Sequence, residues 1–231
     1  MHITQIQLWI SNFQQTVRFY RDTLDFKLLS ADTRTASFRI GGSLFTLHHD
    51  PQQQFHYYHF AFNIPPNLFR EAKAWVAERT KLLTEEGIDE ADFGGITQAN
   101  SFYIEDPAGN IVEFIARRET TPESPVLIFT REQVLGISEI GLATDETGEY
   151  AQRIQDLGIP VRGNEEVSLT QYLNFMGEYE DGSFIILSPL GRRWYFSSKL
   201  AISAPLVVHT DRGVVSNLSD YPALEKRREH V

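Results

Sequence analysis

The spacing of hydrophobic residues changes twice near the start of the chain. Hydrophobic and polar residues alternate over residues 3–10, which predicts a strand with one buried face. From Phe13 to Leu24 the hydrophobic residues recur every three or four positions, which predicts an amphipathic helix. Alternation then returns in three short segments, and a Gly-Gly turn joins the last two. Residues 1–50 therefore predict the order strand, helix, three strands.

The same order recurs between residues 55 and 118. A strand pattern ends at a Pro-Pro pair, and the second proline suits the first turn of the helix that the spacing from Phe69 to Leu82 predicts. Two further strand patterns flank the sequence DPAGN, where Pro107 presets one turn dihedral and Gly109 supplies a permissive one. This part of the chain is therefore a second unit of the same kind.

A third, more degenerate copy follows a polar linker that contains prolines. Alternation over residues 137–143, helical spacing up to Gly158 and a hairpin pattern around an Asp-Gly turn repeat the order in reduced form. The polar residues 220–231 predict an exposed end. We predict paired modules in residues 1–118 (module one, 1–50; module two, 55–118), a linker (119–134), a third module (135–196) and a C-terminal tail (197–231).

Composition limits the classes of protein to consider. The chain of 231 residues is 42% hydrophobic and 23% charged, which is typical of a globular protein. It has no cysteine, which excludes disulfides, thiolate catalysis and cysteine-based zinc sites. A net charge of −10 without a basic run argues against binding to nucleic acid or to an anionic membrane. No hydrophobic run approaches the ~20 residues of a membrane helix, and no secretion signal is evident, so we expect a cytoplasmic protein.

Two segments resemble a known superfamily. Residues 101–115, SFYIEDPAGNIVEFI, contain an aromatic strand, the sequence D-P-x-G-N and an apolar–Glu–apolar strand. Residues 5–26, QIQLWISNFQQTVRFYRDTLDF, join a strand to a helix that contains Phe-Tyr. Both resemble the vicinal oxygen chelate superfamily, which includes glyoxalase I, extradiol dioxygenases and bleomycin- and fosfomycin-resistance proteins. The resemblance implies an α+β fold, in which curved mixed sheets of tandem βαβββ modules form a cup for a ligand or a metal.

The resemblance also implies a set of metal ligands. In this superfamily they come from the first strand of a module, as His or sometimes Gln, and from its fourth strand, as Glu. These positions are His59 and Glu113 in module two, and Gln5 is the first-strand position of module one. The implied cofactor is a divalent ion of iron, manganese or zinc held by His59, Glu113 and Gln5, with no separate cofactor-binding residues. A neutral imidazole and a carboxylate suit such an ion.

The sequence departs from the family's pattern at the fourth-strand position of module one, where Thr46 replaces a glutamate. His48 lies two residues further on and shares the strand face of Thr46, so we expect it to take a catalytic role in place of the missing group. Tyr103 is the second candidate catalytic residue, as a hydrogen-bond donor to a phenol or enediol oxygen. In the third module the corresponding positions are Glu139 and about Ile186, and we expect Glu139 to face solvent or form a salt bridge.

Two classes of function follow. The first is a metal-dependent enzyme that acts on a small molecule with vicinal oxygens. A ring-cleaving dioxygenase is the favoured version, because multi-module chains resemble that branch, and a glyoxalase-like lyase or isomerase is the other. The second is a metal-free protein that binds or sequesters a small molecule, as in bleomycin resistance. An odd number of modules further predicts a homodimer, because it would leave Ile140, Leu142 and Ile185 exposed.

Overall fold

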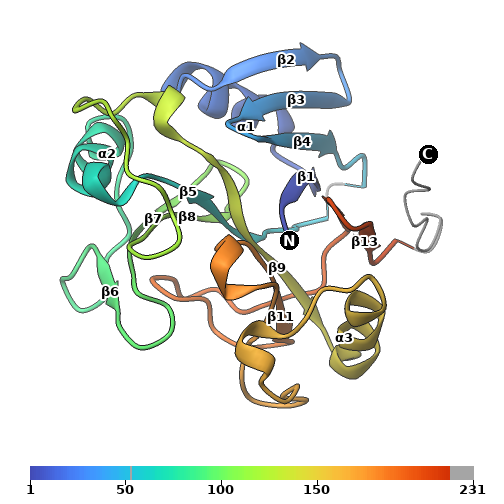
Figure 1. Cartoon of the computed structure of the whole chain (residues 1–231). Helices are drawn as coiled ribbons and strands as arrows, with labels where there is room; N and C mark the ends of the chain where they lie inside the picture. Colours follow the sequence, from blue (N-terminus) through green and yellow to red (C-terminus); the bar gives the residue numbers. More distant parts are fainter. Residues whose placement is uncertain (53, 219–231) are drawn as a thin grey trace, which may run out of the picture.

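The computed structural model describes residues 1–52 and 54–218 and has few helices and one large, curved, mixed sheet (Figure 1). Thirteen strands of the described residues join this sheet, and its main path runs β2-β3-β4-β1-β9-β5-β8-β7-β6. The α+β class predicted from the sequence is therefore confirmed. No helix within these residues combines the length and the apolar character that crossing a membrane requires. The predicted exposed end at residues 220–231 lies outside the described residues.

Module one has the predicted order of elements. Its first strand, β1, lies parallel to its last, β4, and β3 and β2 follow toward the edge. Along β1, Ile6, Leu8 and Ile10 are buried in the core, while Gln5 and Gln7 lie on the opposite face, as period-two alternation requires. The elements are β1 (Ile3–Ile10), α1 (Phe13–Arg18), η1 (Phe19–Thr23), β2 (Lys27–Ala31), β3 (Thr35–Ile40) and β4 (Ser43–His49).

Module two repeats this arrangement, with β5 parallel to β8 and then β7 and β6. Its helix is shorter than the sequence pattern predicts, because Leu82 leaves the helix and forms a β-bridge with Ile104. In the turn DPAGN, buried Asp106 accepts hydrogen bonds from the backbone of Ala108 and Asn110. The elements are β5 (His59–Asn63), η2 (Pro66–Leu68), α2 (Phe69–Ala77), β6 (Ala91–Phe93), β7 (Ala99–Glu105) and β8 (Ile111–Arg117).

The third module keeps only part of the pattern, and the tail adds a hairpin. In this module β9 lies parallel to β11, and β10 pairs with the other side of β11. The predicted C-terminal tail contains β12 and β13, which form an antiparallel pair. The elements are η3 (Arg131–Gln133), β9 (Gly136–Thr144), α3 (Thr147–Asp156), η4 (Arg162–Asn164), β10 (Asn174–Met176), η5 (Tyr179–Asp181), β11 (Phe184–Pro189), β12 (Leu206–Thr210) and β13 (Val214–Ser216).

The pairing between modules differs from the expected one. We expected modules one and two to share a cup, but β9 lies between β1 and β5 and crosses the middle of Figure 1. Module two thus pairs with the third module through β5 and β9, whereas β1 pairs with β12. The physical reason is burial, because every residue of β9 is buried between these neighbours. The chain's own core therefore contains Ile140, Leu142 and Ile185. The homodimer prediction depended on the exposure of these residues, so that argument for a dimer does not apply.

The chain thus has two cups. We call the first the neutral cup, the face of β1, β4 and β12 that carries Gln5, Gln7, Thr46, His48 and His209. We call the second the acidic cup, the face of β5, β8, β9 and β11 that carries His59, Glu113 and Glu139.

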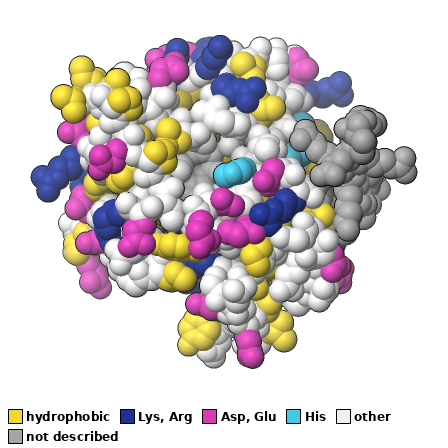
Figure 2. Space-filling model, in the orientation of Figure 1, with side chains coloured by type: hydrophobic (Ala, Val, Ile, Leu, Met, Phe, Trp, Pro, Cys, Tyr) yellow, Lys and Arg dark blue, Asp and Glu magenta, His cyan; other side chains and the backbone are white. Residues whose placement is uncertain are grey.

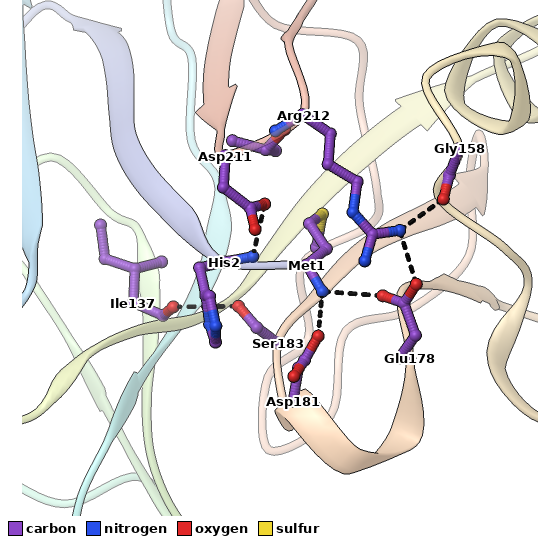
Figure 3. Close-up of polar contacts among 10 residues, drawn as sticks. Met1, His2, Ile137, Gly158, Glu178, Asp181, Ser183, Asp211 and Arg212 are labelled. Carbon is purple, nitrogen blue, oxygen red and sulfur yellow. Dashed lines mark hydrogen bonds and ion pairs between the residues drawn. The ribbon is translucent and has the colours of Figure 1, made fainter. Parts of the chain in front are cut away.

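Polar contacts attach the start of β1 to the third module and to the turn after β12 (Figure 3). The buried amino group of Met1 lies 2.7 Å from a carboxylate oxygen of Glu178 and also contacts Asp181. Arg212 donates a hydrogen bond of 2.5 Å to the same Glu178. The start of β1 and the turn after β12 are therefore both held to the segment between β10 and β11.

Candidate metal site

Three ionisable side chains meet in the acidic cup. Donor atoms of His59, Glu113 and Glu139 all lie within 4.8 Å of one another, and all three side chains are buried. The register explains the meeting, because Ala61 of β5 lies directly across from Glu113 on β8 and from Glu139 on β9. Residues opposite each other in a sheet share a face, and His59 is two residues from Ala61 on that face. The small side chain of Ala61 leaves room between them.

The imidazole of His59 has a defined orientation. Its Nδ1 lies 3.2 Å from the carbonyl oxygen of Ile111, which can only accept a hydrogen bond, so Nδ1 carries the proton. The other nitrogen, Nε2, then has a free lone pair and lies 3.4 Å from Oε2 of Glu113. Burial lowers the pKa of His59, which keeps the ring neutral at neutral pH. This is the arrangement by which proteins hold a histidine for a metal.

In the absence of a nearby cation, the buried carboxyl group of Glu113 does not ionise readily. Burial first, and then the charge of Glu139, raise the pKa of Glu113 to about 8. Tyr103 lies directly across from Glu113 in the sheet, and its ring stacks on Phe196 with 4.7 Å between centroids. Burial and the charges of both glutamates raise the pKa of Tyr103 well above its usual value, so its hydroxyl remains a donor.

Glu139 already has one basic partner. Arg117, on β8, contacts Oε1 of Glu139 in an ion pair that is buried on both sides. Arg117 also donates to the carbonyl oxygen of Gly182 at 3.0 Å and to Ser138 at 3.3 Å, so the guanidinium group is fixed. Glu139 is thus in a salt bridge rather than facing solvent, the second of the two expected environments. Its other carboxylate oxygen remains for a ligand.

A cavity of about 290 Å³ opens beside these groups. Part of its wall is aromatic, and Trp194 packs on His59 with 4.8 Å between ring centroids. We call this part the aromatic wall, which consists of Phe93, Tyr103, Phe175, Trp194 and Tyr195. Gly141 permits this packing, because a Cβ there would lie 2.7 Å from the Trp194 ring. Ile186 also lines the cavity, so the fourth-strand position of the third module is apolar. The outer face in Figure 2 has acidic and basic side chains interspersed, without a basic patch.

The predicted site residues divide between the two cups. His59, Glu113 and Tyr103 line the cavity, but none of its described lining residues comes from β1 or β4. Gln5 instead donates a hydrogen bond of 3.0 Å to Oγ1 of Thr46 in the neutral cup. His48 lies in the same cup and stacks on Trp9, with 4.4 Å between ring centroids.

The sequence pattern did not identify Glu139 as a member of the cluster. Its signal was present, because Glu139 occupies the first-strand position of the third module. What the pattern lacked was the pairing of β9 with β5, which brings Glu139 to His59 and Glu113.

Two family models match separate parts of this chain. Residues 2–114 match the family model described as Glyoxalase/Bleomycin resistance protein/Dioxygenase superfamily. Residues 137–192, which include Glu139, match the model described as Toxoflavin-degrading enzyme. Two metallothiol transferases FosB, from Staphylococcus saprophyticus and Staphylococcus epidermidis, are 26% and 29% identical to this chain over 116 residues. These matches span 48% of this chain and 74% and 80% of the relatives.

Solved structures share the fold at low sequence identity. A putative dioxygenase from Bacillus subtilis aligns with a TM-score of 0.55 and 15% identity, over 81% of this chain and 63% of its own. A glyoxalase I mutant from Zea mays aligns with a TM-score of 0.52 and 14% identity, over 81% of this chain and 66% of its own. By this match, residues 2–114 of the chain form a domain of the Glyoxalase/Bleomycin resistance protein/Dioxygenase superfamily.

Proposed function

We propose that the acidic cup holds a divalent metal ion and that the protein is a metal-dependent enzyme acting on a small molecule with vicinal oxygens. The observation that carries the proposal is the contact between Nε2 of His59 and Oε2 of Glu113 at 3.4 Å. Both atoms are hydrogen-bond acceptors when Glu113 is ionised, and both are buried. Two buried lone pairs that face each other beside a second carboxylate suit a cation.

The donor set suggests which ion fits. One imidazole and two carboxylates suit zinc or manganese. Non-haem iron oxygenases commonly use two histidines and one carboxylate, and the acidic cup has a single histidine. Among iron, manganese and zinc, the ions expected from the sequence, we therefore favour manganese or zinc. When bound, such an ion acts as a Lewis acid toward substrate oxygens.

The chain's own residues have distinct tasks in this proposal. Hydrogen bonding to Ile111 fixes the ring of His59, and Arg117 fixes Glu139. Tyr103 keeps its proton and provides a hydrogen bond to a substrate oxygen next to Glu113. The aromatic wall offers flat apolar surfaces on which a planar ring can stack. A flat ring with two neighbouring oxygens is the substrate of a ring-cleaving dioxygenase, which we retain as the proposed reaction for a manganese site. Zinc has no redox chemistry and would support only reactions that need a Lewis acid.

Two other reactions remain within the metal-dependent class. A glyoxalase-like lyase or isomerase would use the same donors. The name of the Staphylococcus relatives, metallothiol transferase, points to group transfer. For either reaction we expect the aromatic wall to contribute less to substrate binding than it would in ring cleavage.

One observation favours the metal-free alternative, a protein that binds or sequesters a ligand. Arg117 already neutralises Glu139, and a protonated Glu113 would donate a hydrogen bond to Nε2 of His59. The raised pKa of Glu113 makes that protonated form accessible near neutral pH.

Metal analysis separates the two proposals. We expect protein purified without chelators, then incubated with Mn²⁺ or Zn²⁺ and desalted, to retain about one ion per chain. His59→Ala should lose it, whereas His56→Ala, which changes a histidine outside the cavity, should retain it. If the parent retains no ion under these conditions, the metal-free proposal replaces the enzyme.

A further inference from the structure

The wall of the acidic cup contains two arginines that the metal proposal does not use. Arg162 comes from the short segment η4, and Arg192 from the loop after β11. Neither forms an ion pair with a carboxylate of residues 1–52 or 54–218.

Arg162 is held in place but incompletely bonded. Only 8% of its surface is exposed, and its guanidinium group lies over the ring of Phe175, 4.1 Å from the centroid. Its Nη1 has one long contact, 3.3 Å to the hydroxyl of Thr97. Its Nε is buried and has no hydrogen-bond partner in the described structure. A buried donor without a partner costs free energy, so this position favours a ligand that accepts a hydrogen bond.

Arg192 adds a second positive charge to the wall of the cavity. It is half-buried and lines the same cavity as His59, Glu113 and Glu139. Its Nη1 contacts only a backbone oxygen, that of Arg193 at 3.2 Å.

The balance of charge in the cavity favours an anion. Arg162 and Arg192 equal the two glutamates in number, and Arg117 contributes a third guanidinium group behind Glu139. Positive groups are therefore in excess before any metal binds, and a divalent ion would increase that excess. Planar guanidinium groups match the geometry of a carboxylate.

We propose that the acidic cup binds a planar aromatic ligand bearing a carboxylate, with Arg162 as the anchor of the anion and Arg192 as the second positive charge. The ring lies against the aromatic wall that includes Trp194 and Tyr195. The proposal deepens the proposed function and rests on it for the vicinal oxygens of the substrate. The carboxylate site itself requires no metal, so the two proposals can fail separately.

Calorimetric titration with a matched pair of probes tests the proposal. Naphthalene-2-carboxylate and its neutral carboxamide have the same ring and differ in charge. We expect the parent to bind the carboxylate at least about tenfold more tightly than the amide, the factor expected of a charge-assisted hydrogen bond. Titrating the protein as purified and after EDTA treatment removes direct ligation of a metal as an explanation.

Variants test which arginine is responsible for the preference for the carboxylate over the amide. Arg162→Met should reduce the preference to about one, and Arg192→Met should reduce it partly. Arg153→Met, which removes an exposed arginine of α3, should leave it unchanged. Equal affinity of the parent for both probes would overturn the proposal, as would a preference that survives in both cavity variants.

Folding and metal content are measured in the same samples. If Arg162→Met is poorly folded, Arg162→Lys and Arg192→Met decide the question. A parent that prefers the carboxylate but retains no metal would contradict the enzyme proposal and leave the anion site standing.

Discussion

The neutral and acidic cups have the same framework and opposite polar chemistry. In each cup the first strand of a module lies parallel to its fourth strand and antiparallel to a partner from later in the chain. Gln5 and Thr46 of the neutral cup occupy the positions that His59 and Glu113 occupy in the acidic cup. The amide of Gln5 donates to Thr46, whereas His59 and Glu113 present lone pairs to each other. The framework therefore places the groups, and their chemistry decides whether they need a ligand.

The other polar side chains of the neutral cup also form hydrogen bonds with one another. The side-chain amide of Gln7 contacts both histidines, with 2.8 Å between its oxygen and Nε2 of His48 and 3.0 Å between its nitrogen and Nε2 of His209. Burial lowers the pKa of both histidines, so the cup has no charge at neutral pH. Amide and hydroxyl groups that satisfy one another need no ion. The comparison predicts metal in one cup only.

The largest expected effect is on metal affinity. Glu139→Gln keeps the size of the side chain and removes the charge that the third module contributes. We expect Mn²⁺ affinity to fall on the order of 100-fold or more, because loss of an outer partner alone costs 10–100-fold. Competition against a fluorescent chelator measures it. An unchanged affinity would show that Glu139 of β9 is not a ligand. A third ligand would then have to come from module one.

Arg117→Met should have the largest effect on stability without metal. It leaves Glu139 buried and unpaired, and such a loss costs about 3–5 kcal/mol of the free energy of unfolding. Urea denaturation measures the change. Arg153→Met, an exposed arginine 3.8 Å from Glu149, should cost about 0.5 kcal/mol or less. Added Mn²⁺ should stabilise Arg117→Met if Glu139 is a ligand, and no stabilisation by Mn²⁺ would contradict that role.

The pH dependence of metal affinity should follow Glu113. Its pKa of about 8 lies above its unfolded value, so the folded protein without metal binds this proton more tightly than the unfolded chain does. The associated stability is present below the unfolded pKa and is lost as pH rises through about 8. A metal must displace this proton, so affinity for Mn²⁺ should rise about tenfold per pH unit up to about 8 and then level off. Affinity that is flat from pH 6 to 8 would show that metal binding releases no proton from Glu113 in this range, contrary to this prediction.

Much of the framework could be predicted from the sequence, because it depends on local periodicity. Alternation placed His59 and Glu113 on their strands, and the repeated order of elements made them equivalent to Gln5 and Thr46. The partner of β5 could not be predicted, since strand pairing between distant segments leaves no periodic signal. The metal site predicted from the sequence therefore omits Glu139 and includes Gln5 as the third ligand.

The arginines of the cavity could not be predicted from the sequence pattern, for a different reason. Arg162 and Arg192 come from η4 and from an irregular loop, where no periodicity fixes the direction of a side chain. The hairpin of β12 and β13 was missed because each strand is short. Its burial depends on β1, a neighbour some two hundred residues earlier in the sequence.

The smallest expected effect concerns the neutral cup. Thr46→Val removes the hydroxyl that accepts from Gln5 and contacts Ser37, and it should cost about 1 kcal/mol of stability. Metal content should not change, because we assign no ligand to this cup. Loss of bound metal in Thr46→Val, with the fold intact by circular dichroism, would mean that the two cups are not independent.

The account rests on the claim that the acidic cup, and not the neutral one, holds a metal. A crystal grown with Mn²⁺ and measured at a wavelength where manganese scatters anomalously tests it most directly. We predict one strong anomalous peak bounded by His59, Glu113 and Glu139, with a donor atom of each residue bound directly to the ion. A peak beside Gln5 and His48, or no peak beside Glu113 at saturating Mn²⁺, would contradict the account.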